Sequence, residues 1–215
     1  MEDGRLSGRG DSMKLFYSPG ACSLASHIVA LEAGLSLELE AINLRSPERT
    51  MLSGKPFSTL NPKGYVPALL LDDGQVLSEG IAIMLYLAGR APDAGLVPTI
   101  NSMDYLRQIE WLVFISSEVH KGFGPLWNPA LPEEIKKTSI EKLLKRVGYI
   151  DQQLAGKSFL QGDRFSIADA YAFTVLNWSK PLKVDLSAYK NVQVYLERIA
   201  GRPAVQAALK AEGLI

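Results

Sequence analysis

The 215-residue chain contains one cysteine, Cys22, so no disulfide can form within a single copy. A lone cysteine is typical of a reducing compartment, which predicts a cytoplasmic protein. Two alternatives remain for such a residue, a small packing side chain or a reactive thiol.

The chain also lacks net charge and long apolar runs. Lys and Arg total 23, and Asp and Glu total 23. A balanced chain has no general field that attracts nucleic acid or an anionic membrane, so we expect neither partner. Residues 81–88 are among the most apolar stretches, but a membrane span needs roughly 18 such residues.

The first twelve residues, 1–12, are polar and rich in glycine. They lack the apolar core of a signal peptide. We interpret them as a disordered extension before a start-like residue, Met13.

Residues 13–90 show an α/β pattern. A short apolar strand ends at a Pro-Gly turn, and helical spacing follows it as far as Gly34. Leu35, Leu37 and Leu39 alternate with polar residues, which predicts a second strand. Two further strands flank the turn Asp73-Gly74, and a helix opens at Glu79. Strand–helix–strand units predict parallel pairing, with the hairpin as an antiparallel edge.

Residues 91–101 contain proline and glycine without periodicity, so we interpret them as a linker. Residues 102–215 show repeated helical stripes, the first formed by Leu106, Ile109, Leu112 and Val113. The segment 166–169 (SIAD) matches a helix capping box. The chain is therefore predicted to hold a small α/β domain followed by an all-helical domain.

Cys22 lies at the corner where the first strand passes into the first helix. A helix N-terminus carries partial positive charge and free N–H groups, and both favour a thiolate. We therefore expect a lowered pKa and a reactive thiol.

Three other positions are candidates for binding. Pro67 after Val66 begins a strand; in the cis form it would expose the Val66 backbone to a peptide ligand, although trans is the ordinary form. Glu79 and Gly80 open a helix, where they could hold an amino-acid head group or only stabilise the helix dipole. His120 follows the first long helical stripe and could donate to a thiolate or a carbonyl.

Several segments together resemble the cytosolic glutathione transferases, specifically the bacterial beta class. They are MKLFYSPGACSLASHIVALEAGL (13–35), NPKGYVPALLLDDGQVLSEGIAIMLYLA (61–88), QIEWLVFISSEVHKGFGPL (108–126), FSIADAY (165–171) and the tail RPAVQAALKAEGLI. The resemblance covers nearly all of the chain from Met13 onward.

This resemblance implies a thioredoxin-like N-terminal domain, an all-α C-terminal domain, a homodimer and glutathione as co-substrate, with no metal. It implies a cis bond before Pro67 and a catalytic role for Cys22 and His120. The implied glutathione-binding residues are Cys22, Tyr65, Val66, Pro67, Glu79, Gly80, Ser117, His120 and Lys121. The resemblance also implies that Ser117 reaches toward the site of the partner subunit.

The sequence departs from the family pattern in three places. Gly80 stands where many relatives outside this class have serine, so only its backbone can bind. Val113 stands where beta-class members often have asparagine, which removes a polar contact between subunits. The loop 46–53 is longer than usual, and either Arg49 or Lys55 could meet the glycyl carboxylate.

The predicted function is conjugation of glutathione to small electrophiles, with glutathione-dependent thiol–disulfide exchange through Cys22. The alternative is a non-catalytic, partner-binding protein of the same fold. A glutaredoxin-type reductase usually has a Cys-x-x-Cys pair, and Ala25 occupies the second position here. A one-cysteine mechanism through glutathione remains open.

Overall fold

The computed structural model describes residues 13–215. The predicted disordered extension, 1–12, lies outside the described residues. No helix in the described part of the chain combines the length and apolar composition needed to cross a bilayer.

The N-terminal half is a four-stranded sheet in the order β2-β1-β3-β4. Its elements are β1 (Lys14–Tyr17), α1 (Ser23–Glu32), β2 (Glu38–Ala41), β3 (Ala68–Leu70), β4 (Val76–Ser78) and α2 (Gly80–Arg90). The predicted element order is confirmed, and a short 3-10 turn at Phe57–Thr59 lies between β2 and β3. The predicted parallel pairing is right for β1 with β2 but wrong for β3, which is antiparallel to β1. The connection into β3 holds only that short turn, so no crossover helix returns the chain in the parallel direction.

The second strand is shorter than its alternating pattern predicted. Leu39 lies in β2, whereas Leu35 and Leu37 precede it. Pairing begins where Glu38 lies opposite Lys14, the first residue of β1. Leu35 and Leu37 are partly buried against the core, so their alternation reports burial rather than strand pairing.

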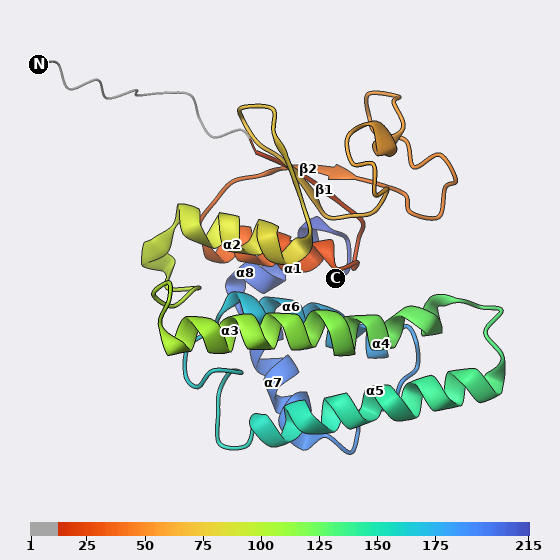
Figure 1. Ribbon diagram of the computed structural model, residues 1–215, viewed down its shortest axis with the longest axis vertical. Coiled ribbons are helices and arrows are strands. Elements are labelled where there is room, and N and C mark those ends of the chain that lie inside the picture. The colour runs from red at the N-terminus through yellow and green to blue at the C-terminus, as the bar shows by residue number, and fades with distance from the viewer. Residues whose placement is uncertain (1–12) are drawn as a thin grey trace, which may run out of the picture.

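Helices α1 and α2 cover one face of the sheet and separate it from the helical half (Figure 1). In α1 the buried residues run continuously from Ser23 to Ala30. One side of α1 meets α2, and the other meets α6 and α8 of the helical half. The two halves therefore share one core through α1.

The helical half begins with one long helix that contains a π-helical turn. Helix α3 (Met103–Phe114) continues through the π turn Ile115–His120 into α4 (Lys121–Phe123). The remaining helices are α5 (Glu133–Gln153), α6 (Ile167–Leu176), α7 (Lys190–Ala200) and α8 (Pro203–Ala211). Every residue of α6 is buried, and Figure 1 shows α6 at the centre of the helical half.

The predicted capping box at the start of α6 is confirmed. The buried Asp169 carboxylate accepts hydrogen bonds from the Ser166 N–H at 2.9 Å and the Ser166 hydroxyl at 2.7 Å. It also accepts bonds from the Leu160 N–H at 2.9 Å and the Tyr195 hydroxyl at 3.0 Å. These donors compensate the cost of burying a carboxylate, and they hold α6 to its neighbours.

The first helical stripe divides between two faces of α3. Leu112 is fully buried, but the side chains of Leu106 and Val113 are 50% and 55% exposed. The inner face is formed instead by Gln108 and Leu112. The prediction of a single buried stripe was therefore wrong, because the helix carries a second apolar face that a single chain leaves uncovered.

Candidate active site

Cys22 lies immediately before α1 and faces a cavity of about 340 Å³ between the two halves. The lining residues are Ala21, Cys22, Leu44, Tyr65, Val66, Pro67, Glu79, Gly80, Met84, Ser116, His120, Lys121 and Tyr171. All of the predicted site residues except Ser117 therefore line a single cavity. Its walls come from the starts of α1, β3 and α2 in the α/β half, and from the π turn, α4 and α6 in the helical half.

Burial raises the pKa of the Cys22 thiol to about 11. The N–H groups of Cys22 and Ser23 act in the opposite direction, as does the ammonium of Lys121, but burial is the largest effect. The expectation of a lowered pKa was therefore wrong for the unliganded site. The protonated sulfur donates a hydrogen bond to the Val66 carbonyl, with an Sγ–O distance of 3.3 Å.

The bond between Val66 and Pro67 is cis, as the family resemblance implied. Within residues 13–215, the Val66 N–H has no hydrogen-bonding partner, while its carbonyl accepts the Cys22 thiol. The cavity therefore presents a free backbone donor next to a carbonyl that Cys22 already occupies.

Glu79 precedes α2 in a left-handed conformation, with φ of 78°. Its exposed carboxylate forms an ion pair with Lys63, and the Tyr65 hydroxyl lies 3.5 Å from Oε1. An added Cβ on Gly80 would lie 3.6 Å from Pro67, an ordinary contact. The structure therefore has room for a small side chain at position 80.

His120 ends the π turn and faces the cavity beside Cys22. Its Nδ1 atom lies 2.7 Å from the Tyr171 hydroxyl oxygen. Burial, together with the neighbouring Lys121 ammonium, lowers the pKa of His120 to about 4. At neutral pH His120 is therefore an uncharged imidazole, while Lys121 supplies a positive charge at the cavity wall.

Ser116 lines the cavity, although the sequence analysis did not identify it. Ser117, which was expected to face the site of the partner subunit, is exposed and donates to the Val113 carbonyl at 2.9 Å. The π turn changes which residues face inward, and it leaves no periodicity signal in a short segment. Tyr171, Leu44 and Met84 were also missed as lining residues, although Tyr171 lies in one of the quoted motifs.

The backbone of Gly20, two residues before Cys22, is held from the helical half at both of its polar groups. Its N–H donates to Glu212 at 3.0 Å, and its carbonyl accepts the Trp178 indole N–H at 2.8 Å. The same Glu212 pairs with the buried His27 at 3.0 Å, so His27 is a packing residue. These contacts fix the loop that carries Cys22.

Two family models match this chain and together cover most of it. The model described as "Glutathione S-transferase, N-terminal domain" matches residues 20–90, and "Glutathione S-transferase, C-terminal domain" matches residues 111–203. The chain belongs to the glutathione S-transferase family.

Individual members of the family match along nearly the whole chain. Glutathione S-transferase GstA of Escherichia coli O157:H7 is 48% identical over 202 residues, covering 94% of this chain and 100% of the relative. The bacterial beta-class enzyme of Sphingomonas chungbukensis is 44% identical with a TM-score of 0.89, at 94% and 100% coverage. A sphingomonad glutathione S-transferase solved with glutathione is 44% identical with a TM-score of 0.88, at the same coverage. The resemblance to beta-class transferases is confirmed.

Within this transferase fold, a second cavity of about 350 Å³ adjoins the Cys22 cavity at Leu44, which lines both. Arg45 and Arg49 line it, and Arg49 also donates to the Gly64 carbonyl. Lys55, the other candidate for the glycyl carboxylate, lines neither cavity. The arginine-lined cavity has the chemistry of a carboxylate site.

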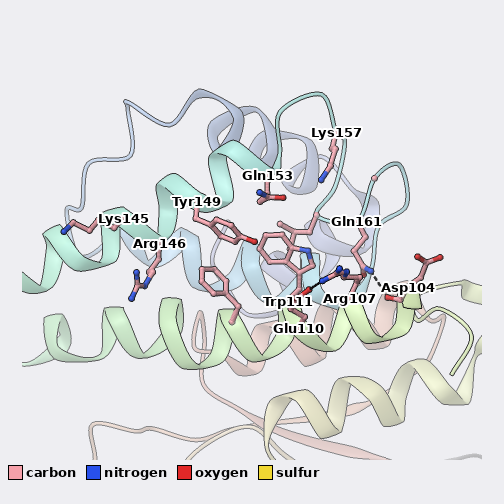
Figure 2. Close-up of a pocket in the computed structure, with 13 residues that line it drawn as sticks. Asp104, Arg107, Glu110, Trp111, Lys145, Arg146, Tyr149, Gln153, Lys157 and Gln161 are labelled. Carbon is pink, nitrogen blue, oxygen red and sulfur yellow. Dashed lines mark hydrogen bonds and ion pairs between the residues drawn. The ribbon is translucent and has the colours of Figure 1, made fainter. Parts of the chain in front are cut away.

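A larger groove of about 690 Å³ lies between α3 and α5, away from Cys22. Figure 2 shows Trp111 and Tyr149 pointing toward each other there, between the charged side chains of Arg107 and Lys145. None of the predicted site residues lines this groove. This groove is therefore not the candidate active site, although it is larger than the Cys22 cavity.

The raised pKa of Cys22 can be tested by alkylation with iodoacetamide in the absence of glutathione. We expect little reaction at neutral pH and a rate that rises about tenfold per pH unit well past the ordinary thiol pKa of about 8.5. Cys22→Ala is the control, because no other cysteine can react. A titration midpoint below 8.5 would contradict the burial argument.

Proposed function

We propose that this protein is a glutathione transferase that uses the Cys22 cavity to bind glutathione and conjugate it to small electrophiles. The observation that carries the proposal is the convergence in one cavity of a carboxylate, a free backbone donor, a thiol and an imidazole. These groups complement the ammonium, peptide and thiol of glutathione. The sphingomonad relative solved with glutathione supports the choice of ligand.

Each part of glutathione has a complementary group. Glu79 takes the γ-glutamyl ammonium in place of Lys63, and the Gly80 N–H at the start of α2 takes the neighbouring carboxylate. The cysteinyl backbone pairs with Val66, which Pro67 holds in place, while Tyr65 forms the adjoining wall. The glycyl carboxylate extends to Arg49 rather than to Lys55.

In conjugation, the glutathione thiolate attacks an electrophilic carbon. A sulfur–carbon bond forms, and the leaving group departs with the bonding electron pair. The donors near the sulfur are the Cys22 thiol, His120 and the N–H groups at the start of α1. Because Cys22 is protonated at neutral pH, it serves as one hydrogen-bond donor among several.

In thiol–disulfide exchange, the Cys22 thiolate attacks the glutathionyl sulfur of a glutathione mixed disulfide. One sulfur–sulfur bond forms and one breaks, which leaves Cys22 joined to a glutathionyl group and releases the other thiolate of the substrate. A glutathione thiolate then attacks this adduct, which regenerates Cys22 and releases oxidised glutathione. Since burial raises the pKa of Cys22, we expect exchange to be slow at neutral pH and faster as the pH rises.

We further propose a homodimer in the cytoplasm, in which Ser117 points toward the site of the partner subunit. The support is the uncovered apolar face of α3, where Met103, Leu106 and Val113 are 63%, 50% and 55% exposed. Ser117 is exposed four residues after Val113 and therefore continues the same face.

We also propose domains at 13–90 and 102–215 joined by a linker at 91–101, since α2 ends at Arg90 and α3 begins at Met103.

Glu79→Gln should weaken glutathione binding at least about tenfold, because it removes the charge that pairs with the ligand ammonium, a contact worth about 1.5–3 kcal/mol. Isothermal titration measures the dissociation constant. Glu134→Gln, an exposed residue on α5, is the matched control. An unchanged constant in Glu79→Gln would mean that Glu79 serves only its helix and Lys63.

Cys22→Ala should abolish exchange and keep most of the conjugating activity, since other donors to the glutathione sulfur remain. Incubation with oxidised glutathione followed by intact-protein mass measures the adduct. Wild type should gain one glutathionyl group, and the variant none. Turnover of both an electrophile panel and a set of glutathione mixed disulfides completes the comparison. Binding of glutathione without any turnover would favour the alternative of a non-catalytic protein.

Val113→Glu should convert the dimer to a monomer, because it places a charge on the apolar face of α3. Sedimentation at micromolar concentration measures the mass. Val194→Glu is the matched control, since Val194 is 52% exposed on α7, outside this face. A wild-type mass of one chain would refute the dimer.

A further inference from the structure

We propose that Tyr171 is a positioning residue that sets the tautomer of His120. The phenol donates to Nδ1, so the proton of the neutral imidazole resides on Nε2, where its N–H is available to the glutathione sulfur. This inference rests on the proposed function, because it assigns a role within the glutathione site. Neither residue exchanges a proton with the substrate in this arrangement.

The geometry of the pair favours a single, fixed contact. Tyr171 lies on the wholly buried helix α6 and is itself 7% exposed. Its hydroxyl oxygen is 2.7 Å from Nδ1 of His120, and the two rings meet edge to face with centroids 5.9 Å apart. Trp178, seven residues along on the same side, packs edge to face against His120 at 4.8 Å. His120 is therefore held on two sides by aromatic rings.

The direction of the hydrogen bond follows from the chemistry of the two groups. Burial raises the pKa of Tyr171, so the phenol keeps its proton at neutral pH. The lowered pKa of His120 leaves the imidazole with one proton and one acceptor nitrogen. A phenol is a strong donor and a weak acceptor, and 2.7 Å is typical of an O–H donor.

The other ring nitrogen of His120 faces the cavity. Within residues 13–215, Nε2 of His120 has no hydrogen-bonding partner, and the His120 side chain lines the Cys22 cavity. The proton on Nε2 is thus the free donor of the pair.

Other titratable groups surround the pair and must be included in any pH dependence. Lys121 adjoins His120 on the same helix, and Cys22 faces it from the start of α1. Glu79 faces the cavity from the start of α2, and its charge acts on both Tyr171 and Cys22. Changes confined to Tyr171 and His120 separate their contribution from these three groups.

The direct test is the ring ¹⁵N spectrum of His120 in the wild-type protein at neutral pH. The proposal expects an unprotonated Nδ1 and a protonated Nε2. His27 is the sole other histidine, and a His120→Gln sample identifies its signals. A proton on Nδ1 would overturn the proposal, and the spectrum that decides this is recorded on the wild-type protein.

The functional test is Tyr171→Phe, which removes only the hydroxyl. We expect the apparent pKa of bound glutathione, followed by thiolate absorbance and by the pH profile of kcat/KM, to rise by about one unit. The dissociation constant of glutathione should change less than about threefold, because the sulfur donor acts mainly on the ionised thiol. An unchanged pH profile with wild-type folding would overturn the proposal.

The same Tyr171→Phe change is then made in the His120→Gln variant. The glutamine amide places an N–H donor near the position of Nε2, but an amide has no tautomers that Tyr171 could control. In this background, Tyr171→Phe should shift the pH profile by less than about 0.3 units. An equal shift in both backgrounds would show that Tyr171 acts independently of His120 and would overturn the proposal. If glutathione fails to bind the wild-type protein at all, the proposed function fails instead, whatever the tautomer of His120.

Discussion

Helix α6 is buried along its whole length, and the groups around the cavity depend on its position. Two hydrogen bonds from Ser166 to Asp169 cap its first turn, and two more, from Leu160 and Tyr195, hold that turn to neighbouring segments. One turn later, Tyr171 contacts His120, and beyond the end of the helix Trp178 binds the carbonyl of Gly20. A single rigid element therefore positions the imidazole from one side and the Cys22 loop from the other.

This arrangement divides the cavity between two structural halves with different tasks. The α/β half supplies the groups that complement a γ-glutamyl peptide, namely Glu79, the Val66 backbone and Cys22. The helical half supplies His120 and Lys121, which we propose lie near the glutathione sulfur. Packing the two halves together also buries Cys22, and this burial outweighs the helix terminus in setting its pKa. The thiol therefore acts first as a hydrogen-bond donor and becomes a nucleophile only where the pH favours the thiolate.

The sequence was informative where local chemistry determines the structure. Cys22 and Glu79 stand at helix starts, and the capping box of Asp169 is readable from residue spacing. It was misleading where the outcome depends on distant packing. The pKa of Cys22 depends on its burial, and the inward position of Ser116 depends on a π turn that periodicity does not reveal. The antiparallel β3 likewise follows from the path of a long loop rather than from its local pattern.

The central claim is that this cavity binds glutathione as a thiolate among fixed donors. The most direct measurement is the number of protons released when glutathione binds at neutral pH, obtained by calorimetry in buffers of different ionisation enthalpy. Because the Cys22 thiol and the imidazole keep their protonation states, a released proton comes from the ligand thiol. The account predicts a release approaching one proton per site. Tight binding with no proton release would show that glutathione remains a thiol, and it would contradict the account.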